Sequence, residues 1–199
     1  MTTEPGEAGP AGRIPEAIMN AALDLFYRQG IDGSSVRDIA GRADVSLSSV
    51  YAYFESKDAL TRAVLIRSHE LVNQHVAPMF DEPEKPAFGL LCQALRMHAV
   101  RHMLIGPAGI ASWINSYSLP KPMRVELHGM QKRYESRFQD LAKQLADDGQ
   151  IVSANLRLKI RMLLNAGIDT GRWYKPTGPS TVEAVADVYV DLCRSVLKG

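Results

Sequence analysis

The 199-residue chain lacks long apolar runs, has little net charge and contains only two cysteines. Its apolar runs fall far short of the roughly 18 to 20 residues that a membrane-spanning helix needs, and its glycine- and proline-rich start does not resemble a secretory signal. The formal net charge of +1 neither favours nor excludes a nucleic-acid partner. We therefore expect a cytoplasmic protein with no membrane partner, in which Cys92 and Cys193 are buried thiols rather than a disulfide.

The main pattern in the sequence is a helical spacing of its apolar residues. Apolar residues recur at helical spacing through most of the chain, and no stretch alternates long enough to predict a sheet. The sequence therefore predicts an all-α fold in which a small N-terminal domain is joined to a larger helical bundle. The first helix runs from about Arg13 to Gly30, and glycine or proline marks nearly every later break. After two short helices, further helices are expected at roughly 57–79, 87–104, 108–118, 122–148, 155–174 and 180–197.

The two short helices lie in the stretch SVRDIAGRADVSLSSVYAYFESK. Ser35 precedes the first of them and Asp38 follows three residues later, which is the spacing of a capping box. Asp44 and Val45 form a turn, and Ser46 is placed to accept a backbone N–H at the start of the second helix. Two short helices joined this tightly are a helix-turn-helix.

The second short helix has an inner and an outer face. Val45, Val50 and Phe54 are expected to pack inward, whereas small polar side chains on the outer face would let the helix enter a major groove about 12 Å wide. Lys57 and tyrosine hydroxyls near a helix start provide donors for phosphate. Core packing of Tyr51 and plain solvent exposure of the serines are the alternatives.

Residues 35–57, with the helix before them, resemble the DNA-binding domain of the TetR family of transcriptional regulators. The family pattern is present, in order and spacing, at Ser35, Ile39–Ala40, Asp44–Val45–Ser46, Tyr51–Ala52–Tyr53–Phe54 and Ser56–Lys57. Asp44 departs from the glycine usual in the turn, so a left-handed backbone there would carry some strain. The resemblance implies phosphate or base contacts, to which Arg37 is added as an outward cation: Ser35, Arg37, Ser46, Leu47, Ser48, Ser49, Tyr51, Tyr53 and Lys57.

The resemblance also implies the organisation and activity of the whole chain. It implies a DNA-binding domain over 13–73 with the helix-turn-helix at 35–54, and a ligand-binding and dimerisation domain over 74–199; the glycine- and proline-rich residues 1–12 before them are expected to be a disordered tail. A homodimer would bind near-palindromic double-stranded operator DNA as a repressor and be released by a small-molecule effector. An effector-independent DNA-binding module or an activator is the alternative. No motif predicts catalytic residues, a cofactor or enzymatic activity.

The last two predicted helices carry apolar and glycine positions suited to a four-helix bundle between two copies of the chain. The apolar face of the final helix needs a partner, and glycines in the helix before it allow close approach. The predicted dimer interface comprises Leu163, Gly167, Gly171, Val182, Val185, Tyr189, Leu192 and Val196.

Effector contacts are expected from side chains with a polar tip above an apolar wall: His98, His102, Trp113, Asn115, Tyr117, Arg124, His128 and Trp173. The two histidines at i, i+4 lack an adjacent Glu and a third ligand, so no metal is expected. Residues 171–197, which contain a loop and the final predicted helix, are similar to the C-terminal segment of TetR-family regulators that respond to acyl-coenzyme A thioesters. A basic cluster could meet coenzyme phosphates or be a solvated helix face: Lys121, Arg124, Lys132, Arg133 and Arg137. An uncharged lipid-like or aromatic effector is the alternative.

Overall fold

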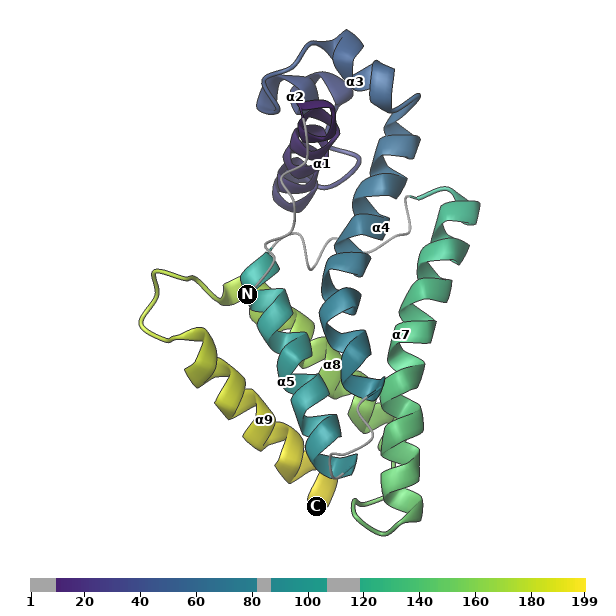
Figure 1. Ribbon diagram of the computed structural model, residues 1–199, viewed down its shortest axis with the longest axis vertical. Helices are drawn as coiled ribbons and strands as arrows, with labels where there is room; N and C mark the ends of the chain where they lie inside the picture. Colours follow the sequence, from purple (N-terminus) through teal and green to yellow (C-terminus); the bar gives the residue numbers. More distant parts are fainter. Residues whose placement is uncertain (1–9, 82–86, 107–118) are drawn as a thin grey trace. The chain divides into compact units, whose positions relative to one another are not determined.

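A computed structural model describes residues 10–81, 87–106 and 119–199 of the chain (Figure 1). All regular elements in these ranges are helical, which confirms the all-α prediction. The predicted helix at 108–118 lies outside the described residues. No helix in the described ranges is long and apolar enough to cross a membrane. The elements are α1 (Pro10–Gln29), α2 (Val36–Arg42), α3 (Leu47–Tyr53), α4 (Lys57–Val76), the 3-10 helix η1 (Ala77–Asp81), α5 (Ala87–Ile105), α7 (Lys121–Asp147), α8 (Leu156–Trp173) and α9 (Val182–Lys198).

The chain divides into two compact units, Met1–Leu65 and Ile66–Gly199. The division falls inside α4, so one continuous helix contributes residues to both units. The first helix begins at Pro10, which places residues 10–12 of the expected tail in a helix. Proline is tolerated at a helix start because its missing N–H would have no partner there.

The N-terminal unit has its own core, formed by one face of each of its helices. Ile18 and Phe26 of α1, Ile39 of α2, Val50 of α3 and Leu60 of α4 are almost completely buried. Partly buried Val45 and Phe54 pack against this core. The inward face predicted for the second short helix is therefore confirmed, and the opposite face of α3 is left for solvent or a partner.

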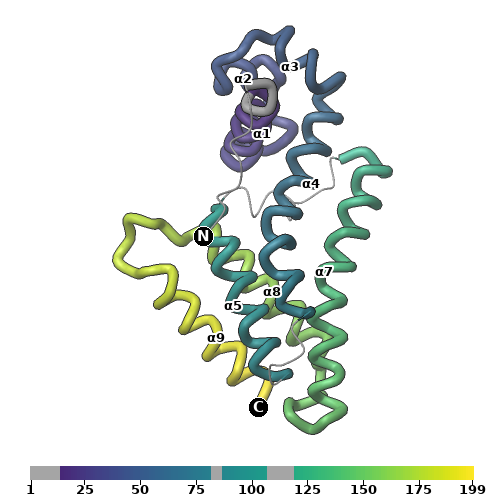
Figure 2. Tube along the Cα trace, in the orientation of Figure 1, coloured from purple at the N-terminus to yellow at the C-terminus, as the bar shows by residue number. Residues whose placement is uncertain are grey.

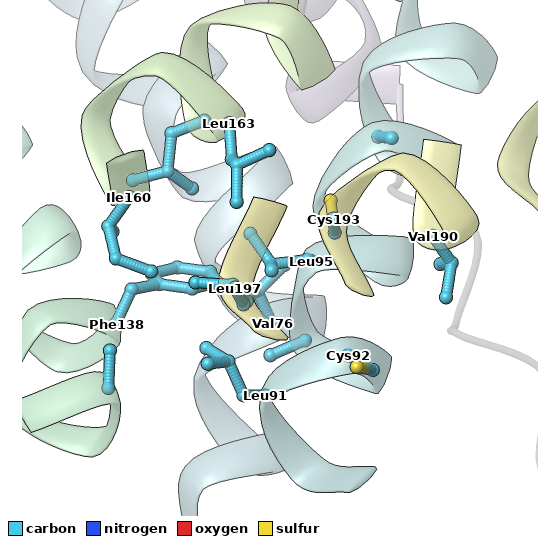
Figure 3. Close-up of a cluster of buried hydrophobic side chains, with 14 of the residues drawn as sticks. Val76, Leu91, Cys92, Leu95, Phe138, Ile160, Leu163, Val190, Cys193 and Leu197 are labelled. Carbon is cyan, nitrogen blue, oxygen red and sulfur yellow. The ribbon is translucent and has the colours of Figure 1, made fainter. Parts of the chain in front are cut away.

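In the C-terminal unit, α5 packs against α8, α9 and α7, and Figure 2 follows these helices through the unit. The core lies where their apolar faces meet: Figure 3 shows Leu91 and Leu95 of α5 with Phe138 of α7 and Leu197 of α9, all fully buried. Burying four such side chains stabilises the unit by several kcal/mol in total, at roughly 1.5–3 kcal/mol each.

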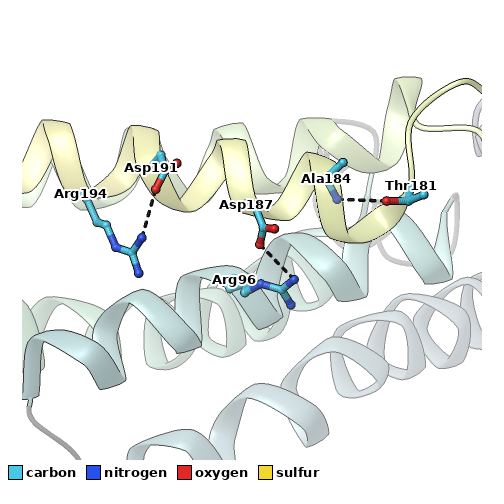
Figure 4. Close-up of polar contacts among 6 residues, drawn as sticks. All are labelled: Arg96, Thr181, Ala184, Asp187, Asp191 and Arg194. Carbon is cyan, nitrogen blue, oxygen red and sulfur yellow. Dashed lines mark hydrogen bonds and ion pairs between the residues drawn. The ribbon is translucent and has the colours of Figure 1, made fainter.

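Two polar contacts hold α9 in place: an ion pair that joins it to α5 and a side-chain cap at its own start. Arg96 of α5 pairs with Asp187 at 3.3 Å, and the Thr181 side chain caps α9 by accepting from the Ala184 N–H at 3.2 Å (Figure 4). Both cysteines are buried free thiols, as the sequence predicted, and lie on these two helices. Burial raises the pKa of Cys193 to about 12, so this thiol stays protonated at neutral pH.

Candidate functional sites

Side-chain caps define the first helix of the predicted helix-turn-helix. The Ser35 hydroxyl oxygen accepts from the Asp38 N–H at 3.1 Å, and an Asp38 carboxylate oxygen accepts from the Ser35 N–H at 3.1 Å. This is the predicted capping box, which is confirmed. The Ser35 hydroxyl also donates to Asp38 at 2.6 Å, and these hydrogen bonds from Ser35 lower the pKa of that carboxyl. Ser35 must therefore rotate its hydroxyl before it can donate to a phosphate.

The turn and the second helix also follow the predicted pattern. Asp44 has φ of 53°, the left-handed conformation expected at a turn position that is usually glycine in the family that the stretch resembles. Ser46 caps α3 by accepting from the Ser49 N–H at 3.0 Å. Its hydroxyl oxygen also lies 2.8 Å from that of Ser48 and 2.7 Å from that of Ser49. The three hydroxyls therefore form one small cluster at the start of α3.

The outer face of α3 is accessible. Leu47 is 37% exposed, Tyr51 50% and Tyr53 42%, so Tyr51 is not a core residue. The structure brings all nine predicted DNA-binding residues into the N-terminal unit, on α2, α3, their caps and the first turn of α4. Seven are exposed and two, Ser49 and Lys57, are half-buried.

Sequence reasoning missed an ion-pair cluster behind the helix-turn-helix. Asp24 of α1 lies 2.8 Å from the guanidinium of Arg28 on the same helix and 2.8 Å from that of Arg42 on α2. The hydrogen bond from Arg28 and the charges of both arginines lower the pKa of Asp24. Asp24 thereby ties the end of α2 to α1. Helical periodicity holds no information on the Asp24–Arg42 pair, because these two residues belong to different helices.

The predicted effector residues are placed in separate environments. His98 and His102 are fully buried in the C-terminal unit, whereas His128 and Trp173 are exposed and Arg124 is half-buried. Trp113, Asn115 and Tyr117 lie outside the described residues.

His98 of α5 is hydrogen-bonded to one group from each of two other helices. Its Nε2 lies 2.9 Å from the Leu164 carbonyl of α8, and its Nδ1 lies 2.7 Å from the Tyr134 hydroxyl of α7. The carbonyl can only accept, so Nε2 carries the proton and Tyr134 donates to Nδ1. Burial lowers the pKa of His98 to about 4, against the weaker opposing effect of the Leu164 carbonyl. His98 is therefore a neutral structural histidine at physiological pH.

The outer surface of the C-terminal unit carries a polar groove and an apolar groove near the predicted sites. A groove of about 770 Å³ between α7 and α8 is lined mainly by polar and charged side chains, among them His128, Lys132, Lys143, Arg157 and Arg161. Two of these cations are already paired: Arg161 with Glu135 at 3.2 Å and Lys143 with Asp147 at 2.5 Å. A second groove of about 480 Å³ lies between α8 and α9 and has a largely apolar lining that includes Trp173, Val185, Val188 and Leu192.

The residues predicted for a dimer interface divide between two faces of α8 and α9. Leu163, Gly167, Gly171 and Tyr189 are buried inside the unit, and the Tyr189 hydroxyl donates to the Leu163 carbonyl at 2.8 Å. Val182, Val185 and Val196 are half-buried, and Leu192 is exposed. The outward face, called here the α8–α9 face, carries large exposed apolar side chains that sequence reasoning largely missed: Leu158, Met162, Trp173, Val188 and Leu192.

Comparison with curated proteins finds transcriptional regulators that match a third of the chain and others that match nearly its whole length. Over 70 residues the chain is 43% identical to the HTH-type transcriptional repressor Rv3405c of Mycobacterium tuberculosis, a match that covers 33% of this chain and 37% of that relative. The match therefore spans little more than a third of the relative's length. The HTH-type transcriptional repressor KstR2 of Rhodococcus jostii is 25% identical over 202 residues, which cover 96% of this chain and 95% of KstR2.

A solved structure shares the fold. The crystal structure of AibR in complex with isovaleryl coenzyme A and operator DNA matches with a TM-score of 0.75 at 20% identity, covering 89% of this chain and 96% of AibR.

Family comparison accounts for most of the chain. Residues 18–64 match the bacterial regulatory proteins of the tetR family, and residues 90–197 match the tetracyclin repressor-like C-terminal domain. The second match alone covers more than half of the chain, and the first covers the capped helix-turn-helix. The chain therefore belongs to the TetR family of transcriptional regulators.

Proposed function

We propose that this regulator is a repressor that binds a near-palindromic operator as a homodimer and is released from it by a small effector. The observation that carries the proposal is the exposed outer face of α3, presented by two side-chain-capped helices in a unit with its own core. Two such helices in a symmetric dimer would meet two half-sites. The predicted limits of the DNA-binding domain, 13–73, and of the ligand-binding and dimerisation domain, 74–199, are part of this proposal.

The DNA contacts would be divided between backbone and bases. Tyr53 and Lys57 lie at the end of α3 and the start of α4, where their hydroxyl and ammonium groups would bind phosphates. Between Ser46 and Phe54 the chain has no Arg, Lys, Asn or Gln, so the strong bidentate contacts to guanine or adenine are absent from α3. Operator choice would rest on Leu47 against a thymine methyl, on single hydroxyl bonds and on DNA shape.

Leu47→Ala is expected to reduce the preference for thymine at one position of each half-site by about 1 kcal/mol, because the apolar contact with the methyl group is lost. The measurement is fluorescence anisotropy at fixed salt on the operator and on variants substituted at each position. Lys57→Ala is the control: it should weaken binding to every variant alike and lower the salt slope by about 2 per dimer. Unchanged preference in Leu47→Ala would refute the base contact.

The α8–α9 face is the proposed dimer interface. Val188 is 72% exposed and Leu192 51% exposed, on the helix that also lines the apolar groove. Packing this face against its symmetry mate would remove these side chains from water and form a four-helix bundle. Leu163, Gly167, Gly171 and Tyr189 would support the interface from behind, by packing α8 and α9 within each protomer.

Val188→Asp is expected to produce monomers and to weaken operator binding at least about a hundredfold, because a buried carboxylate opposes association and one half-site contact is lost. Sedimentation velocity and operator anisotropy measure the two effects. Val125→Asp is a matched control, since Val125 is 64% exposed but lies on α7. A dimeric Val188→Asp protein would place the interface elsewhere.

An acyl-coenzyme A thioester is the proposed effector class. AibR, described as a complex with isovaleryl coenzyme A and operator DNA, shares the fold. The α7–α8 groove offers cations for coenzyme phosphates, although Lys132 is the one member of the predicted basic cluster in its lining. Displacement of the C-terminal half of α4 would then change the spacing of the two recognition helices.

The effector proposal is tested by titrating the protein–operator complex with isovaleryl coenzyme A and with isovalerate. Release by the thioester at concentrations where the free acid does nothing is the expected result. A complex unaffected by both would exclude this pair and leave the DNA-binding proposal standing. An uncharged effector, the second candidate, is favoured by the buried histidines of α5.

A further inference from the structure

The two buried histidines of α5 lie one helical turn apart but differ in their partners. His98 uses both ring nitrogens, one toward the Leu164 carbonyl and one toward the Tyr134 hydroxyl. His102 is equally buried, with no exposed surface. Neither His102 Nδ1 nor His102 Nε2 has a hydrogen-bond partner within the described part of the structure. One histidine is therefore satisfied by the protein and the other is not.

An unpaired buried imidazole is unusual. Buried polar side-chain atoms are mostly hydrogen-bonded, and each unsatisfied group disfavours the folded state. A neutral imidazole has one N–H donor and one acceptor nitrogen, and both are unused in His102. Its ring lies edge-on to the His98 ring, with centroids 4.6 Å apart, but this contact satisfies neither nitrogen. The site therefore lacks a donor and an acceptor that an incoming molecule could supply.

We infer that His102 is the hydrogen-bonding contact for the effector, and that the group it binds is an uncharged oxygen, a carbonyl or hydroxyl, on an apolar portion of the effector. This inference rests on the proposed function, because it presupposes a small effector in the C-terminal unit. A ketone or thioester carbonyl would accept from the imidazole N–H, and a hydroxyl could pair with both nitrogens.

The surroundings of His102 favour an uncharged group over a carboxylate. Burial, together with His98 and His69, lowers the pKa of His102 well below its usual value, so the ring is neutral and supplies no charge to a buried anion. Arg101, the preceding residue, has a buried Nε with no hydrogen-bond partner among the described residues. Successive residues are separated by about 100° around a helix, so the Arg101 and His102 side chains leave α5 in different directions.

Neither of the two outer grooves described above includes His102 in its lining. His102 has no exposed surface, so an effector that reaches it must displace the groups that cover the ring. Its binding would select an opened form of the C-terminal unit, which is the type of change that a ligand-responsive regulator requires.

Substitutions at the two histidines separate a ligand contact from a structural residue. His102→Leu should raise the Tm by roughly 2–4 °C, because an unsatisfied polar ring is replaced by an apolar side chain of similar size. His98→Leu, the matched control, should lower the Tm, because Tyr134 and the Leu164 carbonyl lose their partner. His102→Gln restores a donor and an acceptor. All three proteins are also assayed for operator binding without effector, so that release by effector is compared only among variants that bind the operator.

A matched set of eleven-carbon probes tests the ligand chemistry: methyl nonyl ketone, its alcohol, undecanoate and undecane, with isovaleryl coenzyme A as a thioester. Binding is measured by thermal shift and by release from the operator. We expect the ketone and alcohol to bind wild type more tightly than undecane and undecanoate, His102→Leu to lose at least about tenfold in ketone affinity, and His102→Gln to recover part of it.

Several results would overturn the inference. These are a lowered Tm in His102→Leu, unchanged ketone affinity in that variant, tighter binding of undecanoate than of the ketone, or no shift with any of the carbonyl and hydroxyl probes. Failure of the proposed function is distinguishable, because it would be seen as absent operator binding by the wild-type protein before any probe is added.

Discussion

Gly167→Ala is expected to lower the free energy of unfolding by about 3 kcal/mol. A Cβ at position 167 would lie 2.5 Å from His98 Cδ2 and 3.0 Å from both His98 Nε2 and the Tyr189 hydroxyl. These atoms cannot move freely, because each ring is held by a hydrogen bond to an α8 carbonyl at Leu164 or Leu163. The added methyl group must break one of these bonds or push α8 away from α5.

Urea unfolding followed by circular dichroism measures the effect, and Gly89→Ala is the matched control. Gly89 lies in α5, and a Cβ there would meet no atom within 4 Å. Alanine at position 89 should therefore stabilise the protein by up to about 1 kcal/mol through helix propensity alone. Equal effects at the two positions would show that α8 and α5 do not approach closely at Gly167.

Acidification is expected to destabilise the C-terminal unit strongly between about pH 6.5 and 4. Burial lowers the pKa of His69 and of His98 to about 4, from an ordinary value near 6.5. In this window the unfolded chain binds protons that the folded protein does not, so the free energy of unfolding falls as pH falls. His98, which is fully buried, accounts for a loss of about 3 kcal/mol at the acid end of the window.

Urea midpoints between pH 7.5 and pH 4 test this pH dependence. His69→Phe should give a shallower dependence, because it removes one of the titrating rings while keeping a ring for the edge contact with Tyr134, whose centroid lies 5.7 Å away. A free energy of unfolding that is constant from about pH 6.5 to 4 would mean that the histidines titrate normally in the folded protein.

Local patterns in the sequence predicted the N-terminal unit well. The Ser35–Asp38 capping box, the Ser46 cap and the left-handed turn at Asp44 all depend on residues within four positions of one another. A short stretch of sequence therefore determines their geometry. The inward position of Val50 follows in the same way from the helical repeat.

The effector and dimer sites depend on contacts between distant parts of the chain, which a single sequence does not specify. The partners of His98 are 36 and 66 residues away, so nothing near position 98 distinguishes it from His102. In α9 the apolar face is broad enough to serve both the protomer core and a partner. The sequence therefore could not show that Tyr189 faces inward while Val188 faces outward.

The buried cysteine of α9 can report how often this helix opens. Cys193 has no exposed surface and packs in the core shown in Figure 3. A thiol reagent can modify it only while α9 is detached from α5, so the labelling rate under native conditions reports how often that detachment occurs. Comparing the labelling rate of the free protein with that of the operator-bound protein would show whether operator binding changes the rate at which α9 opens. Both cysteines are native residues, so the measurement requires no mutation when the modified peptide identifies which thiol has reacted.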